Sequence, residues 1–185
     1  MSPLQPVIST RVFSHLVASS LSRHPEAERL APFVFHLLPG ALEVAQKLAA
    51  YLVDLPAPAS DTTLFGRALC SAVLAVDRLG TVPWTTVNHL AGYPVFVGAL
   101  LFDVTDIARL RVTFSTGRPW NPSDGPFLPH LKRPGRSVSF YDGQPTPAEL
   151  VSLRVQMLTH LIASTDLPRL SSSWRSILSP QDHAS

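Results

Sequence analysis

The stretch from Arg109 to Arg136 carries six basic side chains and one acid, Asp124, so its net charge is +5. The whole chain has a net charge of +2, which leaves −3 for the remainder. Local positive charge is typical of surfaces that meet phosphate groups or acidic side chains. Two aromatic rings in the same stretch could stack on a base or enter a lipid headgroup layer. The predicted binding residues are Arg109, Arg111, Arg118, Trp120, Phe127, His130, Lys132, Arg133 and Arg136.

Other residues capable of chemistry lack the spacing that chemistry requires. The sequence contains no Gly-x-Ser-x-Gly, P-loop or Gly-x-Gly-x-x-Gly motif, and its seven histidines show neither His-Glu-x-x-His nor cysteine-paired spacing. Cys70 lies in an apolar stretch, which favours a buried, inert thiol over a nucleophile. Asp103 and Asp106 lack the glycine of a calcium loop and are interpreted as turn residues. No cofactor or metal is expected, and an enzyme without a local motif is the least favoured class.

Composition bounds the class of protein and its surroundings. The chain has 185 residues, 45% of them hydrophobic and 15% charged, against the roughly 25% charged residues of an ordinary soluble domain. A surface short of charge favours self-association. One cysteine indicates a reducing, intracellular compartment, and no apolar run reaches the roughly 20 residues of a membrane-spanning helix. Abundant arginine and proline are typical of GC-rich or overlapping genes, which suggests a viral origin.

The N-terminal half has helical patterning. Apolar residues recur every three or four positions over 7–21 and 41–55, and Pro25 begins another helix that Pro39-Gly40 ends. Prolines within 56–60 predict a stiff connector, and residues 62–79 predict a helix in the middle of the core.

The second half changes to strand-like composition. Residues 94–105, 109–116 and 137–141 predict about three antiparallel strands, in which Arg109 and Arg111 point to the same side. The intervening loop, 117–135, is long enough to suggest a binding function. Thr146-Pro-Ala-Glu149 is a capping box that begins a helix over 147–164. The predicted fold is therefore α+β, with one domain over 1–168 and a loosely ordered Ser/Pro-containing tail over 169–185.

Two hypotheses of different class follow. The first is a non-enzymatic, self-associating structural or accessory protein, of a viral capsid, matrix or host-factor-binding type, that contacts RNA or an anionic membrane through the basic loop and strand. The second is a protein-binding adaptor in which Trp120, Phe127 and the prolines form a docking loop and the arginines meet an acidic partner.

Overall fold

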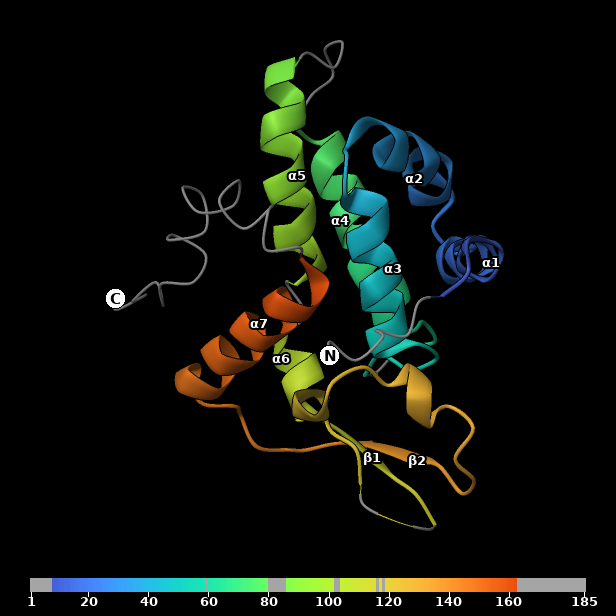
Figure 1. Cartoon of the computed structure of the whole chain (residues 1–185), viewed down its shortest axis with the longest axis vertical. Helices are drawn as coiled ribbons and strands as arrows, with labels where there is room; N and C mark the ends of the chain where they lie inside the picture. The colour runs from blue at the N-terminus through green and yellow to red at the C-terminus, as the bar shows by residue number, and fades with distance from the viewer. Residues whose placement is uncertain are drawn as a thin grey trace, which may run out of the picture.

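The fold is a helical body with a small sheet at one end, seen in a computed structural model of the chain (Figure 1). The structure describes residues 8–58, 60–79, 86–101, 104–115, 117 and 119–162. Its elements follow the order α1 (Thr10–Leu21), α2 (Pro25–Leu37), α3 (Ala41–Leu52), α4 (Leu64–Asp77), α5 (Thr86–Leu100), α6 (Val104–Arg109), β1 (Leu110–Thr113), η1 (Pro122–Asp124), η2 (Leu128–His130), β2 (Ser137–Phe140) and α7 (Pro147–Leu161). The predicted α+β class, with a helical N-terminal half, a small antiparallel sheet and a C-terminal helix, is confirmed.

Local capping explains where several helices begin. The Thr63 hydroxyl accepts from the Gly66 N–H at 3.0 Å and begins α4. The capping box predicted for α7 is present, because the Thr146 N–H donates to Glu149 at 2.7 Å and the Glu149 N–H donates back to Thr146 at 3.3 Å. Pro25 occupies the first turn of α2, as expected.

Helix α4 is the centre of the helical body. It contacts α1, α2, α3 and α5, and Leu69 and Val73 on it are fully buried. Edge-to-face rings join the surrounding helices, since Phe13 of α1 packs on Phe65 of α4 with centroids 6.2 Å apart. The prediction of a central core helix over 62–79 is thus confirmed.

The strand predicted over 94–105 is wrong. Residues up to Leu100 belong to α5, and α6 begins at Val104. The valines and glycines of this segment have strand propensity, but Tyr93, Phe96 and Leu100 are buried at helical spacing, and the helix packs against α4. Packing against α4 decides the conformation.

The sheet consequently has two strands rather than about three. Strands β1 and β2 are antiparallel, with Leu110 opposite Phe140 and Thr113 opposite Ser137. Val112 exchanges two backbone hydrogen bonds, of 3.0 and 2.9 Å, with Trp120 on the other side of β1. The returning loop is therefore tied to the sheet.

The segment Ala91–Arg109 is long and apolar enough to cross a membrane by length and composition alone. Just over half of its most apolar window, 53%, is buried inside the fold, as in a core helix. The predicted domain end at residue 168 and the predicted tail over 169–185 lie outside the described residues.

Candidate nucleic-acid interface

The outer side of the sheet is a polar surface. Side chains alternate along β1, so that Leu110 and Val112 are buried while Arg111 and Thr113 are exposed, as the sequence predicts. Their partners across the register, Ser139 and Ser137, are also exposed. We call these four residues the sheet face. It offers one guanidinium and three hydroxyls to a ligand.

Arg111 is held in place without a carboxylate partner. Its Nη1 donates to the carbonyl oxygens of Ala108 at 2.9 Å and Leu110 at 2.7 Å. Within the described part of the chain no carboxylate lies within 4 Å of it. Hydrogen bonds from Thr146 lower the pKa of Glu149, and the charge of Arg111 adds to this lowering. The remaining guanidinium N–H groups of Arg111 can therefore donate to a phosphate.

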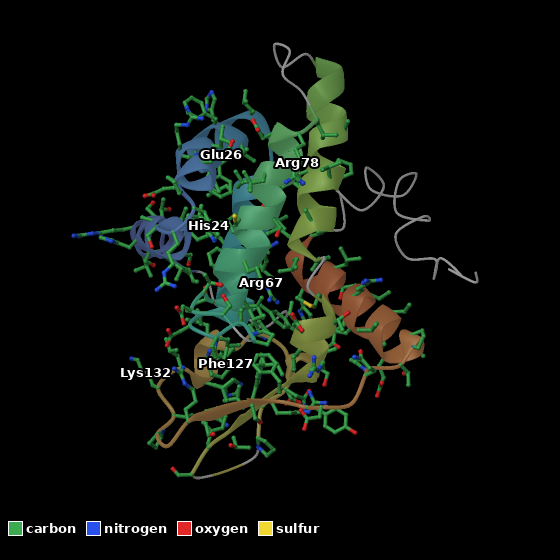
Figure 2. All side chains as sticks on the ribbon, turned by 180° about the vertical axis from the view of Figure 1, so that it is seen from behind. His24, Glu26, Arg67, Arg78, Phe127 and Lys132 are labelled. Carbon is green, nitrogen blue, oxygen red and sulfur yellow. The ribbon has the colours of Figure 1, made fainter. Side chains whose placement is uncertain are left out.

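Lys132 and Arg133, which we call the basic tip, lie beyond the far end of β1. The Arg133 guanidinium sits over the Phe114 ring, 5.2 Å from its centroid, and the Arg133 N–H donates to the His130 carbonyl at 3.0 Å. Both residues are exposed, and Lys132 points away from the body of the protein (Figure 2). Neither has a carboxylate within 4 Å among the described residues.

A glycine fixes the path from the basic tip into β2. Gly135 has a φ of +62°, and a Cβ on it would lie 2.4 Å from the Ser115 side chain. At this close contact between the two segments, the Ser115 hydroxyl donates to the Pro134 carbonyl at 3.3 Å. The tip therefore leaves the sheet at a defined place, about 13 Å along the strand from Arg111.

Arg109 and Arg136 are instead committed to partners in their own chain. Arg136 pairs with Asp54 at 2.9 Å and lies over Phe127, 5.7 Å from the ring centroid. Arg109 ends α6, donates its Nε–H to the Tyr141 carbonyl at 2.7 Å and lies 3.9 Å from Asp106. The prediction that Arg109 and Arg111 both project from one strand is wrong, because Arg109 belongs to α6.

Trp120 and Phe127 are core residues, so the predicted stacking of their rings on a base or in a lipid layer is wrong. Trp120 is 2% exposed and its Nε1–H donates to the Gly125 carbonyl at 3.0 Å. Phe127 is fully buried, 4.9 Å from Trp120 between ring centroids, and lies between the helices and the sheet (Figure 2). An exposed loop could not bury rings of this size, whereas the two 3₁₀ turns fold them inward.

His130 joins this aromatic cluster. Its ring lies 6.2 Å from both Phe114 and Phe127, and its Nδ1 is buried without a hydrogen-bond partner in the described structure. Burial lowers the pKa of His130 and the nearby Arg133 lowers it further, while Asp124 opposes them. The imidazole is therefore neutral at pH 7 and supports the loop more than it binds an anion.

A cleft of about 270 Å³ opens beside the sheet face, between the η1 turn and α7. Arg111, Glu149, Ser152 and Gln156 contribute to its lining. Glu149 is its one carboxylate and is engaged in the α7 capping box, and no histidine or cysteine is among the lining residues. The described residues contain no group of three or more His, Cys, Asp or Glu side chains that could hold a metal.

The structure therefore separates the predicted binding residues into two groups. It brings Lys132, Arg133 and Arg136 together at one end of the sheet and places Arg111 at the other, while Arg118 lies outside the described residues. The sheet-face hydroxyls were missed as binding residues, although the alternation of β1 was visible in the sequence. Asp54 was also missed, since it is 82 residues from Arg136 and no local pattern links them.

Comparison with known proteins supplies no relative, since no family model, curated protein or solved structure matches the chain.

Proposed function

We propose that this protein is a non-enzymatic, self-associating RNA-binding protein whose sheet face and basic tip contact the phosphate and ribose groups of RNA. One observation carries the proposal. Arg111, Lys132 and Arg133 are exposed and have no carboxylate within 4 Å among the described residues, so their guanidinium and ammonium groups can donate to a ligand. Among the described residues of this region, Arg136 pairs with Asp54 and Arg109 lies 3.9 Å from Asp106.

The hydroxyls of the sheet face favour RNA over a membrane. Ser139 lies opposite Arg111 on the sheet face, and Thr113 and Ser137 form the next pair along the strands. Hydroxyls of this kind commonly hydrogen-bond phosphate and sugar oxygens. Insertion into a lipid surface requires exposed apolar or aromatic side chains. Trp120 and Phe127 are buried, which removes the two aromatic anchors that the sequence suggested.

The same burial weakens the adaptor hypothesis. A docking loop needs exposed anchors that can enter a pocket of the partner, and the two rings proposed for that role are enclosed by their own domain. An acidic protein partner would then have to bind through the cations alone. Contacts restricted to backbone phosphates predict RNA binding with little sequence preference, because base edges are not read.

Self-association and a viral structural or accessory role belong to this proposal on composition. The chain is only 15% charged, and large apolar side chains such as Phe33 and Val12 are 62% and 58% exposed on the helical side. Such a surface is covered most simply by a second copy or by an assembly of copies.

Fluorescence anisotropy with a labelled 20-nucleotide oligo(U) RNA tests the RNA contact. Combined Ala substitution of Arg111, Lys132 and Arg133 is expected to weaken binding by about tenfold or more at 100 mM KCl. A matched control removes the same charge from the exposed helical side with R11A, R23A and R29A, and is expected to bind like wild type.

Binding to vesicles that contain phosphatidylserine distinguishes a membrane surface from RNA as the source of the phosphate groups. Binding to vesicles but not to RNA, with the same dependence on Arg111, Lys132 and Arg133, would replace RNA by a membrane surface. Equal loss of RNA binding in both triple variants would show that net charge, and not this surface, governs binding.

A further inference from the structure

Strand β2 has an unpaired edge. Val112 directs its backbone N–H and C=O at Trp120, so Arg111 and Thr113 are the β1 residues that exchange hydrogen bonds with Ser139 and Ser137. Tyr141, two residues after Ser139, also directs its N–H at the neighbouring chain segment, since it donates to the Arg109 carbonyl at 2.7 Å. The backbone groups of Val138 and Phe140 therefore point away from β1.

No described residue satisfies these outward groups. Within the described ranges, Val138 and Phe140 have no backbone hydrogen bond other than those of the sheet itself. Natural edge strands are usually protected by a lysine, a proline or an inward charge. The segment Ser137–Phe140 contains none of these, so the edge is open to another strand.

We infer that β2 pairs antiparallel with β2 of a second copy across a twofold axis at Ser139, forming one four-stranded sheet. This inference rests on the proposed self-association but not on the RNA contact. The backbone N–H and C=O groups of Val138 and Phe140 point outward, so each of these residues must lie opposite a residue of the second copy whose backbone groups also point outward. This condition allows only registers in which the twofold axis passes through a residue of this segment and not between two residues.

Pairing of apolar side chains selects the register centred on Ser139. There, Val138 lies opposite Phe140 of the second copy, and extending the strands places Arg136 opposite Asp142 of the second copy at both ends. Moving the axis to Val138 would instead place Arg136 opposite Phe140, and moving it to Phe140 would place Asp142 opposite Val138. Only the first register joins the two apolar residues of the segment in an aromatic–aliphatic pair on the core side and leaves neither opposite a charged residue, while Arg136 keeps its ion pair with Asp54.

Edge pairing leaves the sheet face uncovered. Its residues stand perpendicular to the sheet, so the two copies present Arg111, Thr113, Ser137 and Ser139 on one continuous side, with a basic tip at each end. The assembly would offer two sets of cations to one RNA and bind it bivalently.

Disulfide trapping tests the register. On a C70A background, which removes the native thiol, we would compare S139C with S137C, two exposed positions on the same strand and side. Residues at the axis form a non-hydrogen-bonded pair with Cα atoms about 4.5 Å apart, within disulfide range. The two copies of residue 137 would lie about 14 Å apart, which is too far.

The expected result is a disulfide-linked dimer from S139C, none from S137C, and a mixed dimer when S137C is combined with Y141C. Linkage of S137C to itself, or equal linkage at both positions, would overturn the inference. So would an unchanged assembly mass for S139K, which sets two lysines face to face at the axis without altering the backbone.

Sedimentation without RNA separates this inference from the proposal it rests on. A wild-type chain that remains at 20.1 kDa into the hundreds of micromolar would remove both self-association and β2 pairing. A wild-type dimer that S139C does not trap would remove β2 pairing alone. Neither result depends on whether the protein binds RNA.

Discussion

Trp120 holds the loop that presents the basic tip, and Trp120→Phe measures that role. The smaller ring leaves a cavity against Phe127 at a cost of about 1–2 kcal/mol. It also removes the 3.0 Å hydrogen bond to the Gly125 carbonyl, and an unpaired buried acceptor costs about 1–3 kcal/mol. Because Trp120 is 2% exposed, water cannot replace that bond, and we expect the free energy of unfolding to fall by about 2–5 kcal/mol.

Urea unfolding followed by far-UV circular dichroism provides the measurement. With a urea m-value of about 2 kcal/mol per M, the midpoint should fall by about 1 M or more at unchanged slope. Tyr141→Phe is the matched control, since Tyr141 is 62% exposed and its loss of a hydroxyl should change stability by no more than about 0.5 kcal/mol. A Trp120→Phe effect as small as that of the control would refute the burial and the hydrogen bond on which the loop's conformation depends.

Two further predictions concern groups next to the basic tip. The lowered pKa of His130 means that the unfolded chain binds a proton near pH 6.5 while the folded chain does not, so stability should fall as the pH drops below about 6.5. His130→Leu should reduce the difference in unfolding free energy between pH 7.5 and pH 5.5, measured by urea unfolding. The same difference in wild type and variant would contradict this prediction. Asp54→Asn keeps a residue that tolerates the φ of +60° at this position but frees Arg136. Because Asp54 is 63% exposed, the variant should lose less than about 1 kcal/mol of stability while binding RNA about two- to threefold more tightly; weaker binding would place Arg136 outside the RNA contact.

The helices that could be predicted carry local signals. Pro25 at the start of α2 and the Thr146 capping box of α7 lie within a few residues of the structure they specify. The segment containing Pro94, Val95 and Gly98 has strand-like composition, yet it is helical because it packs against α4. That contact joins residues distant in sequence, so periodicity within the segment could not reveal it.

The candidate site shows the same division. Alternation along 110–113 identified Arg111 as exposed from the sequence alone. The loop offered no comparable signal for Trp120, because a large ring among prolines and polar residues fits both an exposed anchor and a buried one. Its burial depends on the bridge to Val112 and on packing with Phe127. The neutralisation of Arg136 by Asp54 likewise depends on a tertiary contact.

The salt dependence of RNA binding measures how many phosphate contacts the sheet face and the basic tip make. Affinity for oligo(U) would be measured from 50 to 300 mM KCl for wild type and for the R111A/K132A/R133A variant. Each phosphate contact to a single strand contributes about 0.7 to the slope of log affinity against log salt, so we expect the triple variant to lose about 2 from that slope. An unchanged slope, or an equal loss in the R11A/R23A/R29A control, would contradict the assignment of the RNA contact to the sheet face and the basic tip.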